Sequence, residues 1–354
     1  IATDGGGSGG VVYDVLTDVN LAGTTKTAAL TNAGALSNQG TVTVGVDDTG
    51  YDVKFFGATA GKYALWDESA DSWIISGTQS TVTAGTSNYI AGVNAGNSIA
   101  SGGNYNVAVG DEAGTAITTG DNNVAIGYAA LDANTTASNN TAIGLSALTA
   151  NITGDRNVAV GTYALDANTV GVRNNAIGYN ALGADTQGSK SVAFGYGAIQ
   201  TQNLTSATDT FNVGIGYNSL GGNTTGINNT AIGGESLDSN TTASNNTAVG
   251  YASLGANTTG PGNTAVGYTA LDANTTGEYN TAIGQAAMGV NTTGDNNVAV
   301  GSGALDANTT ADNNTAVGGS ALGANTTGTN NVAVGANAAD ANTTGGAITA
   351  VGIN

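Results

Sequence analysis

The sequence predicts an all-β protein: a parallel β-solenoid, or β-roll, with 17-residue coils, preceded by a small β-rich N-terminal module. Three observations predict this fold class. One short phrase recurs, as in Asn-Thr-Ala-Val-Gly at 263–267 and Asn-Val-Ala-Val-Gly at 297–301. The last glycines of its copies stand 17 residues apart, except for one step of 21 between Gly195 and Gly216. Within each phrase the large residues alternate with alanine, the two-residue period of a strand. A fixed short period of this kind indicates a solenoid.

The last glycine of each copy, here called the marker glycine, occurs in all fifteen copies. We expect a tight corner with φ > 0, or a close approach of two chain segments, at each of them. The predicted corner residues are Gly110, Gly127, Gly144, Gly161, Gly178, Gly195, Gly216, Gly233, Gly250, Gly267, Gly284, Gly301, Gly318, Gly335 and Gly352.

Composition excludes several classes of function. The 354 residues include 57 glycines and one proline, and the 6 basic residues against 25 acidic ones give a net charge of −19. This balance argues against nucleic acid and anionic membranes as partners, since both are bound through Lys and Arg. The absence of Cys and His excludes thiolate nucleophiles, Ser-His-Asp triads and ordinary zinc sites. We therefore expect no enzyme activity, catalytic residue, cofactor or metal, and no membrane insertion, because no apolar run of 18 residues occurs.

The N-terminal part divides into short segments. Residues 1–10 read as a flexible Gly/Ser linker, 11–45 as a β-rich shaft segment, and 79–87 as a second linker. Residues 46–78 are predicted to form a small β-meander domain with strands at Asp52–Phe56, Tyr63–Asp67 and Ser72–Ser76. The solenoid is assigned to 88–354, and since the chain stops inside a repeat, we expect that a downstream segment was removed after assembly.

Each coil has an inner and an outer side. The residue before the marker glycine is always large and apolar, and the residue two earlier is almost always Val or Thr, so both point to one side of a strand. The residue between them is alanine in every regular copy except Gly214. We expect the aliphatic side to fill a thin interior, and a sister chain to cover the alanine side.

Two further features complete the 17-residue unit. An Ala-Leu pair, as at Leu131, is predicted to form a second short strand. The asparagine four residues before the marker glycine, as at Asn106, is predicted to stack as an amide ladder. Because so thin a coil buries little against the entropy of ordering a Gly-rich chain, a closed homo-oligomer is expected.

The repeated phrase resembles the head repeats of YadA-type trimeric autotransporter adhesins. Its longer form at 263–277 also looks like repeats of bacteriophage tail fibres. The resemblance covers about residues 88–354 and implies a left-handed parallel β-roll wound as a homotrimer. Two parts of these families are missing from the sequence: the coiled-coil stalk with its membrane barrel, and the self-cleaving C-terminal chaperone.

The four extra residues lie in Gln200–Phe211 and predict a protruding loop. Leu204, Asp209 and Phe211 are the candidate receptor contacts, and a tolerated insertion without a role is the alternative. Other patterns suggest candidate sites: Asn-Thr-Thr for glycosylation or ice binding, Asp132 for calcium, and stacked tyrosines such as Tyr179 for a sugar. Turn formation and packing are the simpler interpretations of these patterns.

The function expected from these features is that of a non-enzymatic fibre, most of all a phage tail fibre that attaches to a host surface. The partners would be sister chains in a homotrimer and a host surface glycan or protein. The protein would reside in the virion, or outside or on the surface of a cell. A bacterial surface adhesin or extracellular filament subunit is the alternative; an ice-binding protein or a glycan-degrading tailspike is less favoured.

Overall fold

The computed structural model describes residues 53–56, 63–67, 72–76 and 84–353. The expected linker at 1–10 and shaft segment at 11–45 lie outside these residues. The chain divides into two units, residues 1–78 and 79–354. The finer domain boundaries drawn from the sequence stay predictions.

The described part of the first unit is a three-stranded antiparallel sheet. Its strands are β1 (Val53–Phe56), β2 (Tyr63–Asp67) and β3 (Ser72–Ser76), in the order β1-β2-β3. They agree to within a residue with the strands expected from the sequence. Trp66 of β2 is in register with both Val53 and Trp73, so the two tryptophans are cross-strand neighbours.

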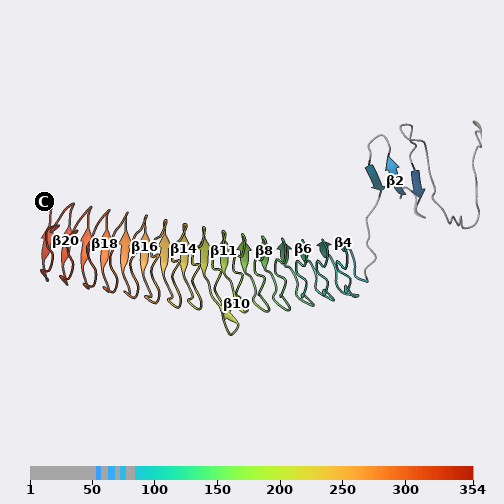
Figure 1. Ribbon diagram of the computed structural model, residues 1–354, viewed down its shortest axis with the longest axis horizontal. Coiled ribbons are helices and arrows are strands. Elements are labelled where there is room, and N and C mark those ends of the chain that lie inside the picture. Colours follow the sequence, from blue (N-terminus) through green and yellow to red (C-terminus); the bar gives the residue numbers. More distant parts are fainter. Residues whose placement is uncertain (1–52, 57–62, 68–71, 77–83, 354) are drawn as a thin grey trace, which may run out of the picture. The chain divides into compact units, whose positions relative to one another are not determined.

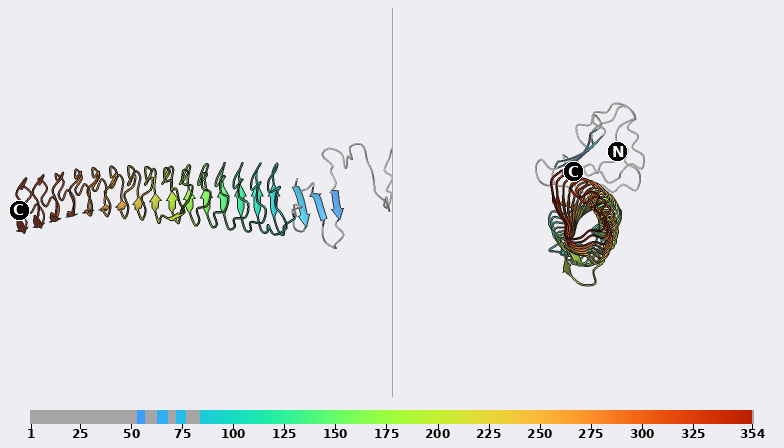
Figure 2. Two further views of the ribbon diagram at one scale, coloured as in Figure 1. Left: turned by 90° about the horizontal axis from the view of Figure 1, so that it is seen from below. Right: turned by 90° about the vertical axis from the view of Figure 1, so that its left-hand side faces the viewer.

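The second unit is a solenoid in which each coil contributes one three-residue strand to a single parallel sheet of sixteen strands. Figures 1 and 2 show the coils stacked in order along one axis, with no helix among the described residues. The strands are β4 (Tyr89–Ala91), β5 (Val107–Val109), β6 (Val124–Ile126), β7 (Thr141–Ile143), β8 (Val158–Val160), β9 (Asn175–Ile177), β11 (Val192–Phe194), β13 (Val213–Ile215), β14 (Thr230–Ile232), β15 (Thr247–Val249), β16 (Thr264–Val266), β17 (Thr281–Ile283), β18 (Val298–Val300), β19 (Thr315–Val317), β20 (Val332–Val334) and β21 (Thr349–Val351).

The register repeats from coil to coil. Ala125 pairs with Ala142, and Ala265 pairs with Ala282, so in the regular coils each residue lies over its equivalent 17 positions on; between β4 and β5 the offset is 18. The longer step does not disturb the stack, because Val192 still pairs with Val213 across it. The fifteen steps between the sixteen strands, each at the spacing of parallel strands, give a rod of roughly 70 Å.

The strands bury the side that was expected to face outward: the alanines lie inside the coil and the large aliphatic residues lie outside. The central alanines, such as Ala108, are buried in one core with the leucines of the Ala-Leu pairs. The flanking aliphatics point outward; Ile126 is 36% and Ile283 is 40% exposed. The prediction that sister chains cover the alanines is therefore wrong, since the chain covers them itself. At Gly214, the one central position without alanine among the regular copies, Ile199 fills the space instead: a Cβ there would lie 2.7 Å from Cγ1 of Ile199.

The predicted second strand is also wrong. The Ala-Leu segment is a turn, and its leucine lies in the left-handed region, with φ of 54° at Leu131 and 53° at Leu254. This conformation costs a bulky residue on the order of 1–2 kcal/mol. Full burial of the leucine side chain contributes about 1.5–3 kcal/mol and offsets that cost, so leucine is kept where the backbone alone favours glycine.

Two ladders of buried asparagines line the turns. In the predicted one, Asn123 donates its backbone N–H to Oδ1 of Asn106 at 2.9 Å, and Nδ2 of Asn106 donates to the carbonyl of Gly120 at 2.8 Å. The second, which the sequence analysis missed, uses the Asn of Asn-Thr-Thr. There Nδ2 of Asn151 donates to Oδ1 of Asn134 at 3.0 Å, and later coils repeat the bond. These bonds satisfy polar groups that would be costly to bury unpaired.

The marker glycines end the strands with φ between 121° and 145°. Consecutive ones also touch: a Cβ on Gly250 would lie 2.3 Å from the carbonyl oxygen of Gly267. Both the dihedral and the contact therefore require glycine.

Candidate functional site

One coil departs from the uniform rod. The residues between Gly195 and Gly216 include four more than any other coil, and Figure 1 shows them as a protrusion near β10. Its base is a small parallel pair, β10 (Gly188–Ser189) with β12 (Thr208–Asp209). We call residues 203–211 the excursion.

The three candidate contact residues of the excursion have different environments. Leu204 is buried, with 7% of its surface exposed, so its side chain is not displayed to a partner. Asp209 is exposed and forms an ion pair with Lys190. Phe211 is 52% exposed, and Nζ of Lys190 lies 5.0 Å from the centre of its ring. The structure thus brings Asp209 and Phe211 together around a lysine that the sequence analysis did not select.

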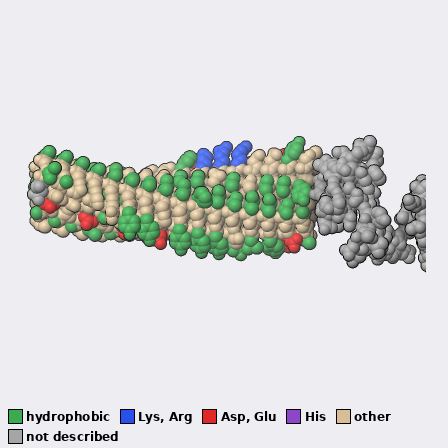
Figure 3. Space-filling view, turned by 90° about the horizontal axis from the view of Figure 1, so that it is seen from above, with side chains coloured by type: hydrophobic (Ala, Val, Ile, Leu, Met, Phe, Trp, Pro, Cys, Tyr) green, Lys and Arg blue, Asp and Glu red, His purple; other side chains and the backbone are tan. Residues whose placement is uncertain are grey.

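Lys190 is the end of a column of three cations on consecutive coils. Each of Arg156, Arg173 and Lys190 stands five residues before a marker glycine. The backbone N–H of Arg173 donates to Asp155 O, and that of Lys190 donates to Val172 O, both at 3.0 Å, so the three residues stack in register. Figure 3 shows the Lys and Arg side chains in one row along an edge of the solenoid. We call these residues the cation ladder.

Two members of the cation ladder are not neutralised. Arg156 and Arg173 are exposed, and among the described residues the sole ion pair is Lys190–Asp209. Asp155 directly precedes Arg156 in the chain, but its Oδ1 accepts a bond from the backbone N–H of Ser138 at 2.7 Å. The 17-residue spacing of the three cations was the signal that could have revealed the ladder from the sequence.

Exposed tyrosines form a second column on the same coils. Tyr179 stacks on Tyr196 with ring centres 5.1 Å apart, and Tyr196 on Tyr217 at 5.5 Å. Stacking covers the ring faces and leaves edges and hydroxyls exposed, which weakens the interpretation as a sugar platform. Tyr163 meets Tyr179 edge to face.

A buried carboxyl lies beneath the excursion. Asp185 replaces an asparagine of the second ladder, and its oxygens accept from Nε2 of Gln202 at 2.7 Å and from the N–H of Gly188 at 3.0 Å. Burial raises the pKa of the Asp185 carboxyl, although these bonds oppose the shift. A carboxylate has no N–H, and Oδ1 of the preceding Asn168 is left without a hydrogen-bond partner.

Two recesses lie elsewhere on the solenoid. One contains Glu235, Asp238 and Asp272 beside Tyr251. The hydroxyl of Tyr251 donates to Oε2 of Glu235 at 2.7 Å, and that bond raises the pKa of Tyr251. Burial raises the pKa of Asp238, with a smaller contribution from the charge of Glu235.

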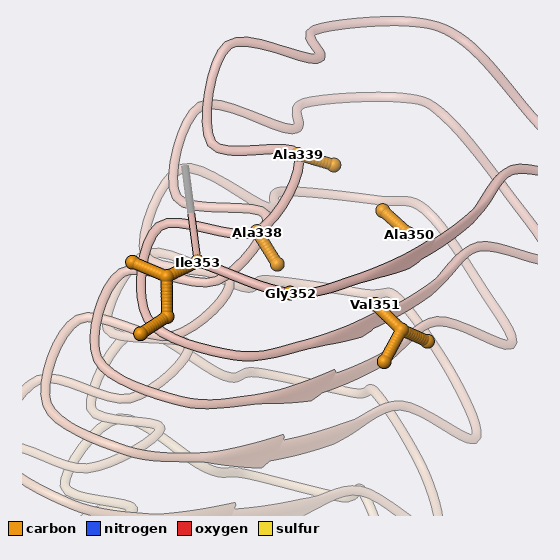
Figure 4. A pocket seen from close by; sticks show the side chains of 6 residues that line it. All are labelled: Ala338, Ala339, Ala350, Val351, Gly352 and Ile353. Atoms are coloured by element: carbon orange, nitrogen blue, oxygen red, sulfur yellow. The ribbon is translucent and has the colours of Figure 1, made fainter.

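The other recess lies at the end of the last described coil, where β21 pairs only with β20. Figure 4 shows it lined by Ala338, Ala339, Ala350, Val351, Gly352 and Ile353. It presents no polar side chain that could orient a ligand. In the part of the chain that the structure describes, no cluster of three or more acidic side chains is placed to hold a metal ion. No helix there is long and apolar enough to cross a membrane.

Comparison with known proteins does not assign the chain to a family. No family model matches the chain, and no curated protein matches it in a sequence search. The parallel β-solenoid with 17-residue coils is observed, whereas the resemblance to tail fibres and YadA-type heads stays a hypothesis.

Proposed function

We propose that this chain is a non-enzymatic structural fibre protein, a bacteriophage tail fibre that works as a homotrimer and attaches to a host surface. The observation that carries the proposal is the outward row of aliphatic residues before the marker glycines. None of the fifteen is buried, and Ile232 and Val334 are each 38% exposed. The row continues for roughly 70 Å, and a contiguous exposed apolar surface of this kind marks an interaction site.

Association through this row would explain how so thin a coil is stabilised and why its aliphatic residues point outward. The alanine core of one coil is thin, and neighbouring copies would remove the outer aliphatic row from water. Because the row repeats in register on every coil, copies aligned in parallel can contact one another along the whole rod. A closed ring of identical copies leaves no unpaired apolar face. The result would be a stiff shaft whose work is mechanical.

A bacterial surface adhesin or an extracellular filament subunit would use the same architecture. Labelling the chain on intact particles and cells, followed by electron microscopy, separates these from a tail fibre. Label at the tip of a virus tail supports the proposal, whereas label on a cell envelope supports the alternative.

Two other functions are less favoured. Ice binding needs flat, exposed threonines, but Thr224 donates its hydroxyl to the carbonyl of Thr241 at 2.9 Å, so one of the two threonine columns is engaged internally. A glycan-degrading tailspike needs an acid pair, for which Glu235 and Asp238 are the candidates. Incubation with host polysaccharide and an assay for new reducing ends tests this; their release, lost on Asp238→Asn, would establish the tailspike.

The trimer is tested by light scattering of the full chain under native conditions. The proposal predicts about three times the chain mass of 34.1 kDa. A particle with the mass of one chain would contradict it.

A further inference from the structure

The cation ladder is concentrated in a way that the fold does not require. Half of the chain's six basic residues lie in the solenoid unit, and all of these stand at one repeat position on three consecutive coils. Seven of the other coils carry asparagine there, for example Asn122, Asn139 and Asn228. The backbone at this position has positive φ, 57° at Asn122 and 60° at Arg156, which asparagine tolerates better than arginine.

Stacking three like charges also opposes folding. Adjacent coils place these side chains about 4.8 Å apart at their backbones, and like charges that face each other across neighbouring strands destabilise a sheet. Asp209 relieves this for Lys190 alone. A column that costs stability and lacks internal partners at two of its three positions is suited to an external anion.

The excursion extends the same column with an aromatic ring. Phe211 occupies the repeat position of the ladder on the next coil, and its ring is half exposed beside Lys190. The order along the rod is therefore guanidinium, guanidinium, ammonium and aromatic ring. Charged groups and an exposed ring in line are the elements that recognise a charged sugar chain: cations bind its acidic groups, and the ring packs against an apolar sugar face.

We propose that the cation ladder and Phe211 bind an acidic polysaccharide, a linear glycan with carboxylate or sulfate groups, lying along the rod axis. This inference rests on the proposed function of surface attachment and names the class of ligand. The acidic groups contact Arg156 and Arg173, and a sugar ring lies against Phe211. At physiological ionic strength, screening over about 8 Å lets this local positive stripe act although the whole chain is strongly acidic.

Other polyanionic partners fit less well. Tight binding of nucleic acid usually depends on many phosphate contacts, whereas the ladder offers three cations on a chain of net charge −19. A second copy of the chain would be met in register along all coils, as the aliphatic row is, yet the cations occupy only three. A contact between copies is therefore treated as an outcome of the test.

The test uses the full chain and a variant in which Arg156→Asn, Arg173→Asn and Lys190→Asn introduce the residue most frequent at this position on the other coils. Binding to immobilised heparin, polygalacturonate and neutral dextran is measured at low and physiological salt. Wild type should bind one or both acidic polymers and not dextran. Two exposed charge pairs, at Arg156 and Arg173, of somewhat under 1 kcal/mol each correspond to about a tenfold change in Kd, which the variant should lose. Its melting temperature should not fall.

Two gain-of-function variants make the test sharper. Asn122→Arg with Asn139→Arg lengthens the ladder to five coils and should tighten binding. Asp209→Asn frees Lys190 and should also tighten it. Relocating the cations, by Asn296→Arg, Asn313→Arg and Asn330→Lys in the triple variant, keeps the net charge. With Tyr279→Asn added, which removes the exposed ring at the same repeat position on the adjacent coil, relocation should not restore full affinity, because no aromatic ring then continues the column.

The outcomes separate this inference from the proposed function. If wild type ignores both acidic polymers, or the triple variant binds them equally well, the glycan site is refuted while a trimeric mass still supports the fibre. If the triple variant instead changes the native mass, the ladder is a contact between copies and the glycan proposal fails.

Discussion

Replacing Asp185 by asparagine is expected to stabilise the coils around the excursion. In the regular part of the second asparagine ladder each amide donates to the side-chain oxygen of the preceding asparagine, as Asn240 does to Asn223 at 2.8 Å. The carboxylate of Asp185 breaks this sequence, so Oδ1 of Asn168 lacks a donor. Asparagine at 185 supplies the missing N–H and removes a buried charge.

The magnitude follows from the orphaned oxygen. A buried acceptor without a partner costs about 1–3 kcal/mol, so Asp185→Asn should raise the local free energy of unfolding by about 2 kcal/mol at pH 7. In a repeat protein this gain appears first in local opening. Amide hydrogen exchange in residues 165–190 should slow by roughly 30-fold, since each 1.4 kcal/mol is a factor of ten.

The pH dependence identifies the cause. Because burial raises the pKa of Asp185 in the folded chain, folding favours its protonated form. The stability contributed by that proton is complete below the ordinary pKa near 3.8 and is lost as pH rises through the higher folded pKa. The advantage of Asp185→Asn should therefore be largest at pH 7 and shrink towards pH 4, where protonated Asp185 can itself donate to Asn168.

Matched variants complete the experiment. Asn240→Asp introduces the same break into an intact part of the ladder and should lower stability by a similar amount. Asp306→Asn, at an exposed position, should change little. If Asp185→Asn exchanges as fast as wild type at pH 7, or its advantage is equal at pH 4, the reasoning about Asn168 is refuted.

Further predictions concern the coil itself. Gly250→Ala places a Cβ 2.3 Å from the next coil and should cost about 3 kcal/mol in chemical unfolding, whereas Gly234→Ala meets nothing closer than 3.5 Å and should be near neutral; equal effects would contradict the contact. Leu254→Ala empties a fully buried site and should cost about 2–5 kcal/mol; a smaller loss would mean that the core collapses around it. Ile232→Asp with Ile283→Asp should reduce the native mass to one chain while circular dichroism stays unchanged; an unchanged mass would place the interface elsewhere.

The 17-residue period predicts much of the architecture. Strict spacing of the marker glycines predicts parallel coils in register, and the structure pairs Ala125 with Ala142 as that spacing requires. What the period did not decide was which side of the strand faces inward. Val and Ile on one side and Ala on the other fit either arrangement, and only the width of the closed coil decides that alanine lies inside.

The turn at the Ala-Leu segment could not be predicted from the sequence either. An apolar Ala-Leu pair at a regular position is interpreted as a strand, because leucine rarely adopts the left-handed conformation that this turn requires. At the excursion, the four extra residues predicted a protrusion, but the burial of Leu204 depends on how the loop folds back. The cation ladder was visible as a 17-residue spacing and was missed because the six basic residues were considered only as a net charge.

The unbroken register has a genetic consequence. Regular coils meet equivalent neighbours, so duplication or deletion of 17 codons among them adds or removes one coil and keeps the same kinds of contact. Unequal recombination would therefore change the length of the solenoid in steps of about 4.8 Å. An insertion shorter than a full repeat has a different result. Between Gly195 and Gly216, four extra residues enlarge one coil, and the neighbouring strands still pair in register.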